Sequence, residues 1–225
     1  MAIIDLRSLE GDQVVIHFGG EFTNVDAYTL ANSLVAFADT AAAVNAVINP
    51  GQTIEIRVEA IGPGSFRALI KKVQKGASGF FSRGAEQLFW GIVAALIVQR
   101  LASGDPTTTI RITSDGVVVE TGSNTTIISK DVFEEAERAK GSEEVQKCLG
   151  RTFETLERDK AIKSFGLTPR MDDLEPAIEI PRDDFPRLIE RPTILESEQR
   201  RIKTRKRSCC DSKGLVQARS TQMVV

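Results

Sequence analysis

The chain contains 225 residues, of which 41% are hydrophobic and 27% charged, and its formal net charge is −2. A chain of this size can bury a core as one domain or as one domain with appendages, and its charge gives no global reason to expect nucleic acid as a partner. Three cysteines, Cys148, Cys209 and Cys210, are too few and too unevenly spaced for a disulfide framework or a zinc site. The N-terminal residues lack the basic and apolar regions of a secretory signal, so we expect a cytoplasmic protein.

The first predicted elements are a strand and a long helix. Residues 14–18, VVIHF, are rich in β-forming side chains and are followed by two glycines. Asn24 or Asp26 can cap the helix that follows, and Asn49-Pro50-Gly51 predicts its end. Apolar residues at alternating gaps of four and three predict a stripe about five turns long. These residues are Leu30, Leu34, Phe37, Ala41, Val44 and Ile48.

A β-hairpin over residues 53–73 is the clearest motif in the chain. Residues 54–60 alternate between apolar and charged side chains, as a half-buried strand does. Gly62-Pro63-Gly64 predicts the turn, and the alternation resumes over residues 66–71. Leu69 falls on the outward side of the second strand, which is a weak indication that this face meets an apolar surface.

The most hydrophobic stretch, residues 86–103, follows a glycine-rich connector and predicts a second helix. Residues 109–113 alternate again, Ser114-Asp115-Gly116 predicts a hairpin turn, and residues 117–120 are expected to pair back as its second strand. The resulting order of strand, helix, strand, strand, helix and strand is that of a split βαβ unit. We therefore predict an α+β fold in which residues 10–128 form a ferredoxin-like sandwich, with two helices on one face of an antiparallel sheet.

A helical arm is predicted after the sandwich, over residues 129–166. Ser129 and Ser142 can each cap a helix, with Gly141 between the helices and Gly166 at the end of the second. The second helix carries an apolar stripe that predicts self-association if the sheet does not cover it. The stripe consists of Val145, Leu149, Phe153 and Leu156.

The C-terminal part of the chain, residues 167–225, has a different composition. It contains five prolines, two acidic pairs and then a basic cluster. Such a composition predicts an extended, poorly packed linker followed by a disordered tail.

Residues 86–103 permit two interpretations. The uninterrupted apolar run is eleven residues long, whereas a helix that spans a bilayer needs about 20, which favours a buried core helix. The flanking aromatic and basic residues, however, resemble the anchors of a membrane-bound helix. The candidate membrane-contact residues are Phe80, Phe81, Leu88, Phe89, Trp90, Ile92, Val93, Leu96 and Ile97.

Six basic residues form a candidate anion-binding cluster near the C-terminus. They are Arg200, Arg201, Lys203, Arg205, Lys206 and Arg207. Such side chains can contact phosphates or anionic lipid. Because no aromatic stacking partner accompanies them, we favour a solvated charge run and do not expect nucleic acid as a partner.

Few residues suggest catalysis. His17, the only histidine, lies on a predicted strand without an obvious partner, which favours a structural role. The glycines within residues 76–84 lack the following Lys-Ser/Thr of a phosphate-binding loop. The acidic pairs Asp172-Asp173 and Asp183-Asp184 fall among prolines, where fixed carboxylate geometry is not expected. We therefore predict no catalytic residue, no cofactor and no metal site.

Two stretches, IRVEAIGPGSFRALI at 56–70 and AIEIPRDDFPRLIERP at 177–192, resemble a widespread uncharacterised bacterial protein family that often lies near mobile elements. The resemblance covers about residues 12–195 and implies no activity, cofactor or site residue. Members of that family continue past the basic cluster into a β-rich region, whereas periodicity here is lost after Arg207. We hypothesise that the tail is a truncated or frame-shifted remnant, which the other two reading frames of the gene would test.

Together these features predict a non-enzymatic interaction module that binds a protein partner or a second copy of itself. Its expected surfaces are the sheet face without helices and the helical arm at residues 143–163. The alternative is a protein of the cytoplasmic membrane, anchored by residues 86–103, such as an effector or sensor in a bacterial mobile-element or defence setting. An enzyme is a third interpretation, which a large thermal stabilisation by nucleotides or metals would support.

Overall fold

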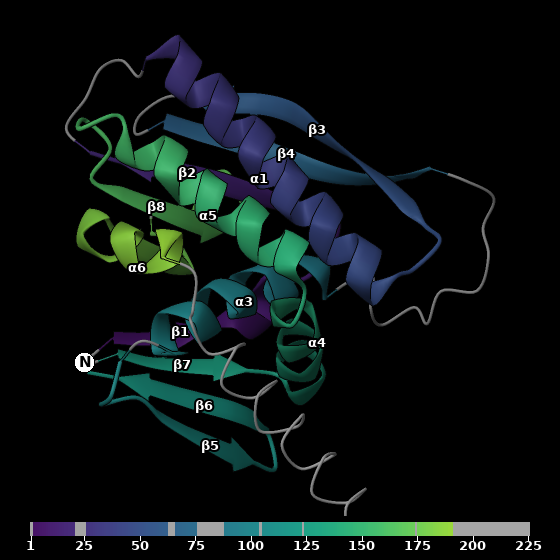
Figure 1. The fold of residues 1–225 in the computed structure, drawn as a ribbon, viewed down its shortest axis with the longest axis vertical. Coiled ribbons are helices and arrows are strands. Elements are labelled where there is room, and N and C mark those ends of the chain that lie inside the picture. Colours follow the sequence, from purple (N-terminus) through teal and green to yellow (C-terminus); the bar gives the residue numbers. More distant parts are fainter. Residues whose placement is uncertain are drawn as a thin grey trace, which may run out of the picture. The chain divides into compact units, whose positions relative to one another are not determined.

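The computed structural model describes residues 2–20, 26–62, 66–75, 88–103, 105–122, 124–173 and 175–190, and its strands form two sheets (Figure 1). The strands are β1 (Ala2–Asp5), β2 (Gln13–Gly19), β3 (Thr53–Gly62), β4 (Phe66–Lys75), β5 (Thr109–Thr113), β6 (Gly116–Thr121), β7 (Asn124–Ile128), β8 (Ser164–Thr168) and β9 (Ile178–Pro181). The α-helices are α1 (Ala27–Ile48), α3 (Phe89–Ser103), α4 (Lys130–Lys140), α5 (Glu143–Glu157) and α6 (Phe185–Ile189). Two short 3₁₀ segments are η1 (Leu6–Ser8) and η2 (Arg182–Asp184).

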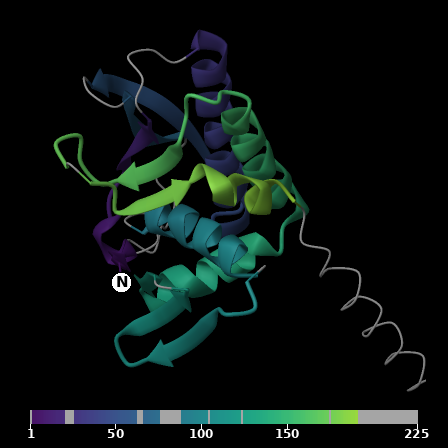
Figure 2. The same cartoon turned by 90° about the vertical axis from the view of Figure 1, so that its left-hand side faces the viewer.

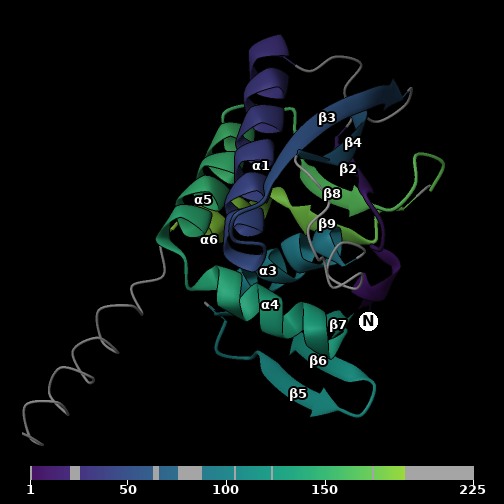
Figure 3. The ribbon, with the colours of Figure 1, turned by 90° about the vertical axis from the view of Figure 1, so that its right-hand side faces the viewer.

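Each sheet has helices on one face. The larger sheet has the strand order β3-β4-β2-β8-β9, with antiparallel neighbours throughout. In the smaller sheet, β1-β7-β6-β5, only β1 and β7 run parallel. Helices α1 and α5 lie together on one side of the larger sheet (Figure 3). Helices α3 and α4 pack on the smaller sheet, and α3 lies between the two sheets (Figure 2).

The mixed α and β class is confirmed, but the strands do not form the single sheet of a ferredoxin-like sandwich. The predicted hairpin at 53–73 is β3 and β4 of the larger sheet, whereas the predicted hairpin at 109–120 is β5 and β6 of the smaller one. The larger sheet instead contains β8, which pairs with β2, and β9, which pairs with β8. Because partners this far apart in the chain are chosen by packing, alternation along the sequence cannot predict them.

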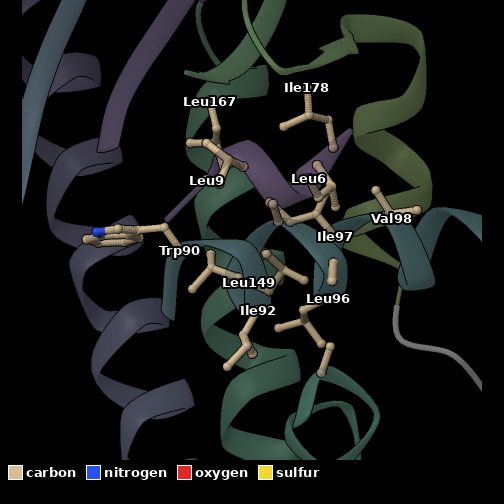
Figure 4. Close-up of a cluster of buried hydrophobic side chains, with 14 of the residues drawn as sticks. Leu6, Leu9, Trp90, Ile92, Leu96, Ile97, Val98, Leu149, Leu167 and Ile178 are labelled. Atoms are coloured by element: carbon tan, nitrogen blue, oxygen red, sulfur yellow. The ribbon is translucent and has the colours of Figure 1, made fainter. Parts of the chain in front are cut away.

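Helix α3 is enclosed by the rest of the chain, as the core interpretation of residues 86–103 expects. Its apolar side chains from Phe89 to Ile97 are at most 1% exposed. Figure 4 shows these side chains among Leu6, Leu149, Leu167 and Ile178, which come from η1, α5, β8 and β9. A helix that meets protein on all sides needs no polar face, which explains why this stretch is apolar all round.

An aromatic cluster joins the larger sheet to its two helices. Phe165 of β8 is its centre, with ring centroids 6.2 Å from Phe18, 5.9 Å from Phe37 and 5.5 Å from Phe153. Trp90 extends the cluster into α3 by stacking on Phe37 at 5.9 Å. Because these rings come from β2, β8, α1, α3 and α5, the cluster fixes how the helices sit on the sheet.

The predicted helix starts are mostly confirmed. Asp26 accepts a hydrogen bond from the Thr29 backbone N–H at 2.7 Å, and Ser142 caps α5 in the same way. Ser129 precedes α4 but makes no capping hydrogen bond through its side chain. Gly166 does not end a helix, because α5 stops at Glu157 and Gly166 lies within β8.

The prediction of an extended linker from residue 167 onward is wrong for residues 167–190. The described residues belong to one compact unit, Met1–Arg191. The prolines occupy positions that tolerate a missing N–H: Pro181 ends β9 and Pro186 lies in the first turn of α6. Pro176 packs over Gly166, where an added Cβ would come within 2.8 Å of the proline side chain. The rest of the predicted linker and tail lies outside the described residues.

Arginines bind the carbonyl groups that helices leave unpaired at their C-termini. Arg138 of α4 donates to Ile48 O at the end of α1 at 3.1 Å, and Arg187 of α6 donates to Leu101 O near the end of α3 at 2.7 Å. A cation at this position satisfies orphan carbonyls and interacts favourably with the helix dipole. Each contact also ties the end of one helix to another helix.

The buried Arg100 donates both to the first turn of α5 and to the C-terminal end of α6. Its Nη1 donates to Gln146 O at 2.9 Å and to Gln146 Oε1 at 2.8 Å, and its Nη2 donates to Glu190 O at 3.0 Å and Ile189 O at 3.4 Å. One guanidinium therefore joins α3, α5 and the end of α6.

Candidate interaction surface

The face of the larger sheet that is turned away from α1 and α5 contains a hollow around His17. Its volume is about 770 Å³. The strand registers place Arg67, His17, Gly166 and Glu179 directly opposite one another across β4, β2, β8 and β9. Directly opposite residues share a face, so these side chains line the side of the sheet away from α1 and α5.

The hydrogen bonds in this hollow are those of a structural site. Ser164 Oγ donates to Glu179 Oε1 at 2.5 Å and so ties β8 to β9. A Cβ on Gly19 would collide with Ser164 Oγ, so the serine hydroxyl would have to rotate away from Glu179. A catalytic serine directs its proton to a base that a third group orients. Here the hydroxyl is bonded to a carboxylate, which does not favour a Ser-His-Glu triad.

His17 is expected to make stability depend on pH. Burial lowers the pKa of His17 below its ordinary 6.5, the charge of Arg67 acts in the same direction, and Glu179 opposes them. The folded chain therefore binds this proton more weakly than the unfolded chain, so stability should fall as the pH drops below about 6.5. We expect His17→Gln to make this fall shallower in thermal melts between about pH 5 and pH 7.5. An unchanged slope would contradict this assignment.

The candidate membrane-contact residues are found mainly inside the fold. Phe89, Trp90, Ile92, Val93, Leu96 and Ile97 are buried in α3, and Leu88 is partly buried beside them. Phe80 and Phe81 lie outside the described residues. Membrane contact through α3 would require this helix to leave the core of its own chain.

One helix in the described part of the chain, α1, is long and apolar enough to span a membrane. It has 22 residues, and 39% of its most apolar window is buried in the fold. Length and composition alone are weak evidence, because core helices of soluble proteins meet the same criteria.

The apolar stripe of the helical arm is not an accessible surface. Val145, Leu149, Phe153 and Leu156 are all fully buried within the chain. Self-association through this stripe requires the stripe to be uncovered, and here the chain itself covers it. Leu69, the other apolar candidate, is only partly exposed.

The remaining candidates have structural surroundings or lie outside the described residues. Asp173 Oδ2 accepts hydrogen bonds from Thr168 Oγ1 at 3.0 Å and from the Arg170 N–H at 3.1 Å, and Asp184 binds Arg187 at 3.2 Å. No group of three or more metal-ligating side chains occurs among the described residues. The basic cluster, the glycines within residues 76–84, Cys209 and Cys210 fall outside them.

The surface that sequence reasoning missed is the outer strand of the smaller sheet. We call it the β5 edge and define it as Thr109–Thr113 with the exposed side chains of Ile110 and Ile112. These isoleucines are 49% and 71% exposed. Their direct neighbours on β6, Val119 and Val117, share the same face of the sheet but are only 1% exposed.

The reason for this difference is the extent of the helical cover. Helices α3 and α4 pack over β7 and β6, and β5 lies farther from them (Figures 1 and 3). The apolar face of the sheet therefore continues onto β5, which these two helices do not cover. The alternation in TIRIT predicts an apolar face, but nothing in it indicates where the covering helices stop.

The β5 edge also has unpaired backbone groups. Among the described residues, β6 is the strand that pairs with β5, and the other side of β5 is open. In an antiparallel pair alternate residues direct their N–H and C=O groups away from the partner, so β5 presents such groups at the edge. Natural edge strands are commonly protected by lysine, proline or a bulge. Here the register with β6 is regular, and Arg111 is the single charged residue of the strand.

No family model, curated protein or solved structure matches this chain. The resemblance to a bacterial family therefore stays a prediction that rests on the two sequence stretches.

Proposed function

We propose that the chain is a non-enzymatic protein-interaction module that binds an extended protein segment along the β5 edge. The observation that carries this proposal is the exposure of Ile110 and Ile112 on the same sheet face as the buried Val117 and Val119. A strand added at this edge would pair the open backbone groups and cover both isoleucines. Because Ile110 and Ile112 are 49% and 71% exposed, covering the remaining surface of each would contribute about 1–2 kcal/mol.

Site-specific photo-cross-linking in expressing cells tests this function. A photoreactive phenylalanine replaces Ile112, and in a matched control it replaces Val35, an exposed aliphatic residue on α1. We expect one discrete cross-linked product from position 112 and none from position 35. Adding Ile110→Lys should remove the product, because it places a charge in the apolar contact.

Two results would contradict the proposal. One is the same pattern of products from positions 112 and 35. The other is a product from position 112 that persists with Ile110→Lys. Either would mean that the β5 edge is not a specific surface.

A further inference from the structure

We infer that the strand which adds to the β5 edge is the β5 edge of a second copy of this chain, paired antiparallel about a two-fold axis through Arg111. This inference rests on the proposed function and names its partner. The sequence pattern of β5, the position of its apolar side chains and the position of its charge each support it.

The sequence of β5 is the same in both directions, Thr-Ile-Arg-Ile-Thr. In antiparallel pairing one strand runs opposite to the other. When Arg111 faces Arg111 of the second copy, Ile110 therefore faces Ile112 of the second copy, and Thr109 faces its Thr113. A two-fold interface uses the same patch on both subunits and therefore requires such self-complementarity. The palindrome meets this requirement for the isoleucine and threonine pairs, and the arginine pair at the axis is the exception.

The apolar side chains meet on the correct face. Ile110 and Ile112 share the face of Val119 and Val117, so pairing about Arg111 brings the isoleucines of both copies together beside two buried cores. The four strands of each copy would then form one continuous sheet of eight strands, a size that occurs in ordinary proteins. The open edge of each copy would be closed in the same step.

The charges lie on the opposite face and are balanced. Arg111 alternates with the isoleucines, and it forms an ion pair with Glu120 on β6 of its own chain. Two arginines facing each other across the axis would repel, since like charges directly opposite are destabilising. Each is accompanied by its own Glu120, so the row of two arginines and two glutamates has no net charge. Because the two arginines still repel each other, exchanging the charges of Arg111 and Glu120 in one copy should change the affinity of the pairing.

A charge-exchange experiment tests the partner and the register together. The double variant Arg111→Glu/Glu120→Arg keeps the ion pair within each chain but places a carboxylate at the axis. We expect mixed dimers of the wild-type chain and this variant to be roughly two- to fivefold tighter than either homodimer, because unlike charges then face each other. Native mass spectrometry of an equimolar mixture, with one chain mass-labelled, measures the fraction of mixed dimers.

Ile112→Lys is the second test, because this side chain is largely exposed in the single chain and its replacement is therefore expected to leave the fold intact. It should abolish dimers in sedimentation velocity, whereas Val35→Lys should not. A wild-type chain that stays monomeric at all concentrations, a statistical fraction of mixed dimers, or dimers that survive Ile112→Lys would each overturn the self-pairing. A cross-link from position 112 to a different protein would then still support the proposed interaction function. The absence of any cross-link would contradict both the interaction function and the self-pairing.

Discussion

Replacing Phe165 by alanine is expected to destabilise the chain by about 3–5 kcal/mol, the usual cost of removing a fully buried phenylalanine. The effect should be large because Phe165 contacts Phe18, Phe37 and Phe153, which belong to one further strand and two helices. Urea unfolding followed by circular dichroism measures the change in free energy.

The matched control is Phe133→Ala, since Phe133 of α4 is only partly buried against the same core. It should cost clearly less than Phe165→Ala. Equal losses from the two substitutions would show that the cluster around Phe165 does not hold the helices to the larger sheet.

The second large effect is expected from Arg100→Ala. The substitution leaves carbonyl oxygens of Gln146, Ile189 and Glu190 without their donor, and hydrogen bonds to a charged group contribute more than neutral ones. We expect a loss of roughly 3 kcal/mol or more in the free energy of unfolding. Hydrogen exchange at the α6 amides should also become faster, because Arg100 ties the end of α6 to α3 and α5.

Arg151→Ala is the control for charge removal alone. Arg151 forms an exposed ion pair with Asp39, and exposed pairs contribute about 0–1 kcal/mol. If Arg100→Ala cost no more than this control, or left exchange in α6 unchanged, the buried contacts of Arg100 would not stabilise the fold.

Local patterns in the sequence predict most of the individual elements. The stripe that begins at Leu30 gives α1, the alternation around Gly62-Pro63-Gly64 gives β3 and β4, and Ser142 marks the start of α5. These signals are reliable because each depends on side chains within one or two turns of helix, or on adjacent strands.

The sequence does not predict which elements pack together. Alternation looks the same in β4 and in β5, yet the two strands belong to different sheets. The prolines at 181 and 186 suggested a linker, although one ends a strand and the other begins a helix. The exposure of the β5 isoleucines cannot be predicted from the sequence either, because it depends on where α3 and α4 end and not on β5 itself.

The place of β8 in the larger sheet has a consequence for biosynthesis. β8 lies between β2 and β9, so β2 lacks one of its two partner strands until residues 164–168 have been made. Over the same interval α3 is without the cover of β8, β9 and α6. Pairing between strands this distant in the chain slows folding and prolongs the exposure of apolar surface. A nascent chain that already contains α3 therefore exposes apolar side chains of this helix until β8, β9 and α6 have left the ribosome.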